Sequence, residues 1–215
     1  MTHLTRLTLD PRHTAVRKDL ADVDSLHKTL MRLVPDNLGP HPRARAGLLF
    51  RLETGPEHVL LIQTAHQPDL NALPRRYGTA QTRNLASMFT ALRPGMPVRY
   101  RITAAPTIAR SAGTPHPHPV TGKRRGKTTP LTGDAADAWW HRRALAAGLE
   151  PLTSHATPRP FPRKDHSRIG PYTLTQFEGH ARITDTDLLT TAVTHGIGKA
   201  KNYGAGLLSL APAQP

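Results

Sequence analysis

The sequence lacks cysteine altogether and is poor in aromatic residues, with two Trp, four Tyr and four Phe among 215 residues. The absence of cysteine excludes disulfide bonds and every cysteine-ligated metal site. A chain of this length needs no such link, because folding buries about 70% of its unfolded surface. No stretch reaches the ~18 apolar residues that a membrane-spanning helix requires, and the N-terminal region contains no apolar block. We therefore expect a soluble, cytoplasmic protein.

Acidic residues are also scarce. The chain has 15 Asp and Glu against 29 Lys and Arg, which gives a net charge of +14, with 13 His in addition. Such an excess of positive charge repels itself unless a polyanion binds to it. RNA, DNA and an anionic membrane all qualify, but no segment combines a basic helix face with a bulky apolar one. The charge therefore predicts a nucleic-acid partner and no membrane association.

The first half of the chain shows a strand, a helix and two further strands in order. Residues 3–9 alternate between apolar and polar side chains, which is typical of a half-buried strand. In residues 24–34 apolar side chains recur at helical spacing, and Pro35 ends the helix. Two short apolar runs, 48–53 and 59–63, flank a turn and predict an antiparallel hairpin.

The first repeat ends with a degenerate helix expected over 67–78 and a closing strand expected over 81–86, and a Pro-Gly pair at 94–95 separates it from the second. The same order of elements recurs in the second half. We expect the second repeat to contain strands near 98–102, 152–161, 171–183 and 206–210 and helices over 134–147 and 187–195. The pattern predicts an α+β fold of two tandem ferredoxin-like (RRM-like, βαββαβ) domains, residues 1–92 and 93–215.

A glycine-rich segment, residues 196–206, follows the last predicted helix. Glycine lets the backbone approach a phosphate closely, and neighbouring lysines add charge. The residues concerned are Gly196, Gly198, Lys199, Lys201, Gly204 and Gly206. The G-x-x-x-x-G-K-[ST] order of a P-loop is absent. The segment therefore indicates a phosphate-binding loop, and the alternative is a helix cap followed by a turn into a strand.

Two basic clusters lie in the predicted second domain, the first within a loop expected at 111–132 because that segment is rich in Pro, Gly and Thr. Such clusters suit an RNA stem, whose A-form helix offers its phosphates more than its base edges. The alternative is a basic loop without a dedicated partner. The clusters comprise Lys123, Arg124, Arg125 and Lys127, and Arg159, Arg163, Lys164 and Arg168.

Several segments resemble, in the same order, the CRISPR-associated repeat-RNA (pre-crRNA) endoribonucleases of the Cascade-type branch, subtype I-E (CasE family). They are LTRLTL at 4–9, LHKTL at 26–30, APT at 105–107, GKR at 122–124, and the glycine-rich segment with LLSLAP after it at 207–212. The resemblance covers nearly the whole chain. It implies tandem ferredoxin-like domains and cleavage at the base of a repeat hairpin, without a metal or other cofactor.

The same resemblance implies the products and the partners. The RNA ends are a 5′-hydroxyl and a 2′,3′-cyclic phosphate or 3′-phosphate. The mature crRNA stays bound, and the protein, a monomer on its own, joins the other subunits of the Cascade surveillance complex.

His27 is the residue that the resemblance implies to be catalytic. With Leu26, Leu30 and Leu33 on the buried stripe of the predicted helix, His27 falls about 100° from Leu26, at the edge of that stripe. A neutral imidazole there can take a proton from a ribose 2′-hydroxyl or give one to the departing 5′-oxygen. The helix by itself is also consistent with a structural side chain at its edge.

Three neighbours on the same helix are candidate catalytic helpers: Asp24, Lys28 and Arg32. Relatives commonly have a tyrosine at the position of Asp24, so the identity of the second proton-transfer group stays open. An ionised carboxylate there would raise the pKa of His27. Lys28 and Arg32 could stabilise the scissile phosphate from the flank, as could Lys199 or Lys201, and the alternative is a solvated helix face.

Other classes of function share some of these features. A noncatalytic protein that binds an RNA stem-loop, or a DNA-associated or ribosomal basic protein, would carry the same charge. The missing P-loop order and the few acidic residues argue against a nucleotide-binding enzyme that uses Mg²⁺. His116 and His118 could ligate a metal, but a Pro-rich turn explains them without one, and we predict no metal site.

Overall fold

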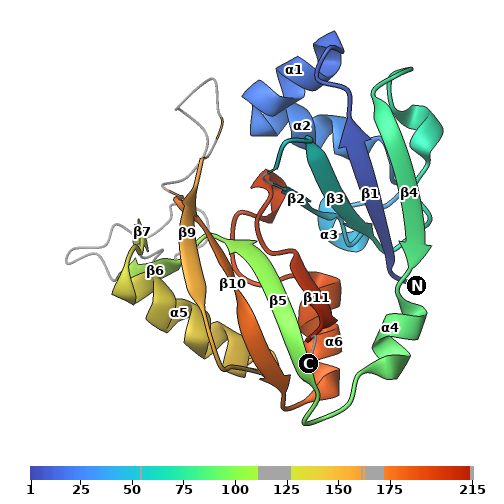
Figure 1. Ribbon diagram of the computed structural model, residues 1–215. Helices are drawn as coiled ribbons and strands as arrows, with labels where there is room; N and C mark the ends of the chain where they lie inside the picture. Colours follow the sequence, from blue (N-terminus) through green and yellow to red (C-terminus); the bar gives the residue numbers. More distant parts are fainter. Residues whose placement is uncertain (54, 111–126, 161, 163–171, 214–215) are drawn as a thin grey trace.

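The computed structural model describes residues 1–53, 55–110, 127–160, 162 and 172–213. Figure 1 shows two antiparallel sheets side by side, each with helices on one face. Each sheet has the strand order of a βαββαβ unit, so the tandem ferredoxin-like fold expected from the sequence is confirmed. Within these ranges no helix is long and apolar enough to cross a bilayer.

The first sheet has the order β2-β3-β1-β4, with β1 antiparallel to both β3 and β4. Its strands are β1 (His3–Leu9), β2 (Leu49–Leu52), β3 (Val59–Thr64) and β4 (Gly78–Asn84), and its helices are α1 (Thr14–Ala21), α2 (Val23–Met31), α3 (Pro42–Arg45) and the 3-10 helix η1 (Leu70–Ala72). Leu7 and Ile62 of the sheet meet Leu26 and Leu30 of α2 in one core. The short η1 takes the place of the second helix, as the prolines in 67–78 predict.

The second sheet has the order β11-β5-β10-β8, and β9 extends the edge beside β10. The elements of this half are α4 (Ala86–Ala91), β5 (Pro97–Ala104), β6 (Thr107–Arg110), β7 (Lys127–Pro130), α5 (Asp134–Leu145), β8 (Leu149–Pro151), β9 (His155–Arg159), β10 (Leu174–Ile183), α6 (Thr186–His195), the 3-10 helix η2 (Lys201–Tyr203) and β11 (Leu208–Pro212). The helix α4 connects the two sheets in Figure 1. The strand expected over 152–161 is present as β9, with β8 before it.

Three local predictions were wrong. The helix α1 was missed because His13, rather than a Ser, Thr, Asp or Asn, caps it, its ring Nδ1 accepting from the backbone N–H of Ala15 at 3.1 Å. The helix expected over 24–34 begins one residue earlier and ends at Met31. Part of the loop expected at 111–132 is a strand, because β7 pairs with β6, and residues 111–126 lie outside the described ranges.

Buried polar groups join the two sheets. Arg51 on β2 is 2% exposed, and its guanidinium donates to the carbonyls of Arg101 at 3.0 Å and Leu207 at 2.9 Å in the second half of the chain. It also pairs with Glu53 at 2.6 Å. The Gln63 amide on β3 donates to a carbonyl near the end of α6 at 2.9 Å. These contacts fix the two halves relative to each other, so a site between them is preformed.

Candidate active site

His27 lies at the edge of the buried face of α2. Asp22 caps the helix, its carboxylate accepting from the backbone N–H of Asp24 at 3.3 Å, and Leu26 points into the core. His27 itself is half-buried, as the helical geometry predicts. Its ring stacks on Phe50 of β2, with 6.4 Å between the ring centroids and 18° between the ring planes.

The Nδ1 atom of His27 is buried and has no hydrogen-bond partner among the described residues. A buried polar atom in this state costs about 1–3 kcal/mol, and most such atoms in native proteins are satisfied. His3 Nδ1 and Gln176 Oε1 are in the same state, so this feature supports a functional role for His27 only together with the pocket beside it. Because Nδ1 is buried, Nε2 is the ring nitrogen left for a ligand in the pocket that His27 lines.

The environment of His27 favours its neutral form. Burial lowers the pKa of the imidazole, the positive charge of Arg43 lowers it further, and the weaker effect of the Asp24 carboxylate raises it. The ordinary pKa of histidine is about 6.5. His27 is therefore neutral at pH 7 and able to accept a proton.

His27 opens onto a pocket of about 440 Å³ between α2, α3 and η2. The residues that line it are His27, Met31, His41, Pro42, Arg43, Ala44 and Asn202. The sequence analysis selected neither Arg43 nor Asn202. Arg43 lies on a four-residue helix without a periodic pattern, and only the tertiary fold brings it to α2.

The predicted helpers lie at different places around His27. Asp24 is close enough for its charge to act on both His27 and Tyr203. Lys28 and Arg32 are exposed and line a neighbouring depression on the flank of α2, which shares Met31 and Pro42 with the His27 pocket. These two cations are not among the residues that line the His27 pocket itself, and their role as helpers stays a prediction.

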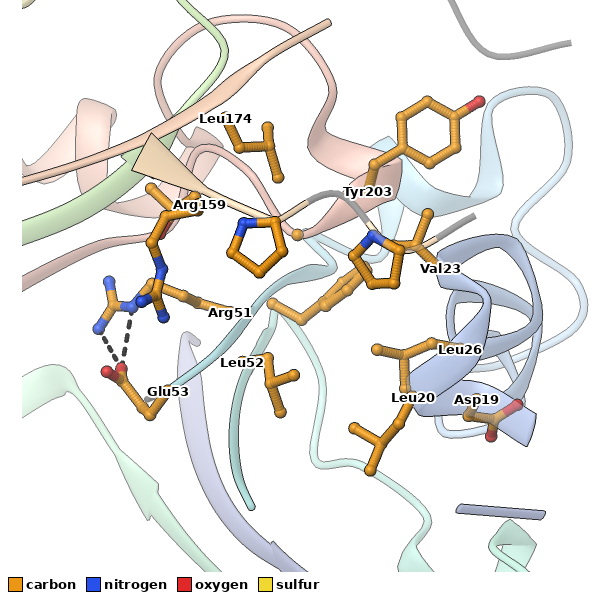
Figure 2. Close-up of a pocket in the computed structure, with 15 residues that line it drawn as sticks. Asp19, Leu20, Val23, Leu26, Arg51, Leu52, Glu53, Arg159, Leu174 and Tyr203 are labelled. Atoms are coloured by element: carbon orange, nitrogen blue, oxygen red, sulfur yellow. Dashed lines mark hydrogen bonds and ion pairs between the residues drawn. The ribbon is translucent and has the colours of Figure 1, made fainter. Parts of the chain in front are cut away.

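Tyr203 of η2 is a further residue that the sequence analysis did not select. Burial raises the pKa of its phenol, and the Asp24 carboxylate and Tyr172 raise it further, so it is protonated at neutral pH. In Figure 2, Tyr203 lies near Val23 in a pocket that Leu26 also lines. The glycine-rich segment thus brings a tyrosine next to α2, because η2 lies against that helix, although no tyrosine precedes His27 on the helix itself.

Gly196 and Gly206 hold the two ends of the glycine-rich segment in the fold. The N–H of Gly196 donates to a carbonyl of α6 at 2.9 Å, and that of Gly206 donates to the Thr103 carbonyl at 2.7 Å. The N–H groups of these two glycines are used inside the protein, as the alternative of a helix cap and a turn predicts. Phosphate binding by the four glycines of the segment stays a prediction.

Replacing Gly196 by alanine is expected to destabilise the fold by about 1–3 kcal/mol more than replacing Gly95, because of overpacking. Both glycines have positive φ, 74° and 83°. A Cβ at Gly196 would lie 2.8 Å from the methyl carbons of Leu49, whereas nothing lies within 4 Å of one at Gly95. Chemical denaturation of Gly196→Ala and Gly95→Ala measures the difference. Equal losses would contradict the close packing of the end of α6 against β2.

The two lysines of the glycine-rich segment point to different places. The Lys201 ammonium donates to the His195 carbonyl at 2.8 Å, and its pKa is lowered by burial and by the charge of Arg43. Lys199 donates to the hydroxyl of Thr128 on β7 at 3.1 Å. Lys201 is therefore the lysine that adds positive charge near the His27 pocket.

The segment after β9 reaches the start of α2. The carbonyl of Pro162 accepts from the backbone N–H of Val23 at 3.1 Å. Arg159 lines the pocket shown in Figure 2, near the ion pair of Arg51 and Glu53. This part of the second basic cluster is thus next to the helix of His27.

Of the remaining predicted cations, Lys127 is the one within the described ranges, where it begins β7. The positions that lie outside the described ranges are Lys123, Arg124, Arg125, Arg163, Lys164 and Arg168, together with His116 and His118.

Comparison with known proteins places these features in a family. A family model described as "CRISPR associated protein" matches residues 2–212. The chain is 32% identical over 225 residues to the CRISPR-associated endoribonuclease Cse3 of Thermus thermophilus, covering 97% of this chain and 99% of the relative. It is 31% identical over 196 residues to the CRISPR system Cascade subunit CasE of Escherichia coli, covering 89% and 92%.

The fold agrees with these relatives. The structure of Thermus thermophilus Cse3 bound to an RNA representing a pre-cleavage complex is similar at a TM-score of 0.79 and 28% identity, covering 98% of this chain and 99% of that chain. The family model matches almost the whole of this chain, and the two relatives are matched over most of their own length. The chain therefore belongs to the family of CRISPR-associated proteins that includes Cse3 and CasE.

Proposed function

We propose that this protein is an endoribonuclease that cleaves CRISPR repeat RNA at the base of its hairpin and so produces mature crRNA. The observation that carries the proposal is the neutral imidazole of His27, half-buried against Phe50 and open to a pocket that Arg43 lines. The names of the relatives support it, since one is an endoribonuclease and a similar structure holds an RNA before cleavage.

In the proposed reaction, Nε2 of His27 takes the proton of the 2′-hydroxyl beside the scissile phosphate. The 2′-oxygen forms a bond to phosphorus, the bond from phosphorus to the 5′-oxygen breaks, and the 5′-oxygen takes up a proton. The products carry a 2′,3′-cyclic phosphate and a 5′-hydroxyl. We propose no metal or cofactor for this step, and we retain Asp24, Lys28 and Arg32 as its candidate helpers.

Incubation of the protein with a repeat transcript in buffer containing EDTA tests this function. We expect one discrete cut, a 5′-hydroxyl on the downstream fragment and a cyclic phosphate on the upstream fragment. RNA that is bound but stays intact would favour the alternative, a noncatalytic protein that binds an RNA stem-loop. Displacement of the transcript by duplex DNA would favour a DNA-associated protein.

The rate of cleavage is expected to hold its maximum to lower pH than an ordinary histidine would allow. Burial and Arg43 lower the pKa of His27, so the base form persists as the pH falls below about 6.5 and is lost only through the lowered pKa. A pH profile of kcat/KM measures this, because it reports on the protein before RNA binds. A rate that already falls between pH 8 and pH 7 with histidine-like slope would contradict it.

We propose that the second basic cluster binds the phosphates of the hairpin stem. Arg159 lies beside the segment that contacts α2, so the cluster starts next to the site. Neutralising Arg159, Arg163 and Lys164 together is expected to weaken hairpin binding and to reduce its salt slope by about 1 per lost phosphate contact. Titrations at several salt concentrations measure both. An unchanged slope would remove the cluster from the interface.

The other predicted contacts and partners belong to the same proposal. We propose a boundary between the domains 1–92 and 93–215, a location in the cytoplasm with the transcript, and assembly of the RNA-bound protein with the other Cascade subunits. One relative is itself named a subunit of Cascade. The further RNA-binding residues that we propose are Lys123, Arg124, Arg125, Lys127, Arg168, Gly196, Gly198, Lys199, Lys201, Gly204 and Gly206.

A further inference from the structure

We propose that Arg43 binds the scissile phosphate and stabilises the negative charge that develops on it during cleavage. The inference rests on the proposed function, since it assigns the cation that acts beside His27. The sequence analysis does not select Arg43, because it predicts the site from α2 and the glycine-rich segment and Arg43 belongs to neither.

The guanidinium of Arg43 is held in place by the fold. One of its terminal nitrogens donates to the carbonyl of Leu48 at 2.9 Å, just before β2. The helix α3 that carries it starts with Pro42 and is tied to the end of β3, where the Ala65 N–H donates to the Ala46 carbonyl at 2.7 Å. A guanidinium has five N–H donors, so this contact leaves others for a ligand. Arg43 and His27 line the same pocket.

The charges around this pocket are suited to an anion. Lys201 and Arg43 lie close enough for the Arg43 charge to lower the pKa of the Lys201 ammonium, and His41 also lines the pocket. Asp24 is the carboxylate whose charge reaches His27, and its effect there is smaller than that of Arg43. No Asp or Glu is among the described residues that line the pocket.

The chemistry of the step requires a fixed cation at this point. When the 2′-oxygen attacks, negative charge builds on the nonbridging oxygens of the phosphate, and His27 starts the step neutral and adds no charge. Arginine stays protonated and can donate two parallel hydrogen bonds to a phosphate. Lys28 and Arg32 are exposed on the flank of α2 and line a neighbouring depression, which shares Met31 and Pro42 with the His27 pocket. Arg43 is the arginine that shares the pocket with His27.

The test compares Arg43→Gln, Arg43→Lys and the control Arg45→Gln. Glutamine retains an N–H donor for the Leu48 carbonyl, and Arg45 lies on the same short helix but is exposed. Single-turnover cleavage by Arg43→Gln is expected to be about 10²- to 10³-fold slower than by the wild type. Arg43→Lys should fall between the two, and Arg45→Gln should stay within threefold of the wild type, about the limit for a surface charge.

Two further measurements separate chemistry from folding and binding. Affinity for a repeat RNA with a 2′-deoxy nucleotide at the cut should change far less than the rate. The pH profile of Arg43→Gln should move to higher pH, because the cation that lowers the pKa of His27 has been removed. A structural role alone would not move this profile in that direction.

Each outcome decides a different point. Wild-type rates from Arg43→Gln would overturn the inference, as would a loss of affinity as large as the loss of rate. If Arg43→Gln is unfolded by circular dichroism, Arg43→Lys decides, and its full activity would contradict a two-bond contact with phosphate. If the wild type binds the repeat but does not cut it, the proposed function itself is wrong. The outcomes for the Arg43 variants, in contrast, decide only the role of Arg43.

Discussion

The His27→Ala variant is expected to cleave repeat RNA about 10²- to 10⁴-fold more slowly than the wild type, the usual contribution of a general base. His27 is half-buried, neutral and open to the pocket through Nε2, so it is placed to accept the 2′-hydroxyl proton. Alanine removes the base and leaves the basic surface intact. Single-turnover assays at saturating protein measure the rate, and binding to a 2′-deoxy repeat should stay within a few-fold of the wild type.

His58→Ala is a matched control for this prediction. His58 is an exposed histidine before β3, outside the residues that line the His27 pocket. Its replacement should leave cleavage unchanged. Parallel loss of cleavage and binding in His27→Ala would assign His27 a structural role, with its ring serving only to pack against Phe50.

The Arg51→Met variant is expected to lose about 3–5 kcal/mol of unfolding free energy, the typical effect of removing one partner of a buried ion pair. Arg51 donates to Glu53 from two nitrogens, at 2.9 Å and 2.6 Å, and to the Ser209 hydroxyl at 2.9 Å. It also satisfies carbonyls of the second half of the chain. Methionine fills the space but removes the donor to the two carbonyls, while Glu53 keeps its ion pair with Arg101 at 3.1 Å. Denaturant titration measures the loss.

The control for Arg51 is the surface pair of Arg6 and Glu57, whose side chains are 52% and 65% exposed and lie 3.3 Å apart. Breaking it with Arg6→Met should cost less than about 1 kcal/mol, since solvent screens exposed pairs. Losses of similar size in the two variants would contradict the view that Arg51 joins the two sheets. In that case the His27 pocket would not be preformed by the docking of the two halves.

Much of the fold follows from the sequence because its signals are local. The alternation in residues 3–9 and the helical spacing after Asp22 reflect which side chains face the core, and both elements are present. The missed α1 lacks such a signal, because among its apolar side chains only Val16 is fully buried and a histidine caps it. The strand β7 was missed because its pairing with β6 is a nonlocal contact.

The residues of the site also divide into those with a local sequence signal and those that only the tertiary fold brings together. The edge position of His27 could be derived from the stripe on one helix. Arg43, Asn202 and Tyr203 could not, because each reaches α2 through the tertiary fold, Arg43 from a four-residue helix and the other two from the middle of the glycine-rich segment. In that segment, Gly196 is needed where the chain passes close to Leu49, and the expected contact of the glycines with a phosphate stays a prediction.

The measurement that tests the central claim most directly uses a repeat hairpin with a single 2′-deoxy nucleotide at the cut. We claim that His27 activates the 2′-hydroxyl, so the modified RNA should bind with unchanged affinity and stay intact in EDTA while the unmodified hairpin is cut. Cleavage of the 2′-deoxy hairpin at the same position would contradict the account, because the attacking oxygen would then come from elsewhere.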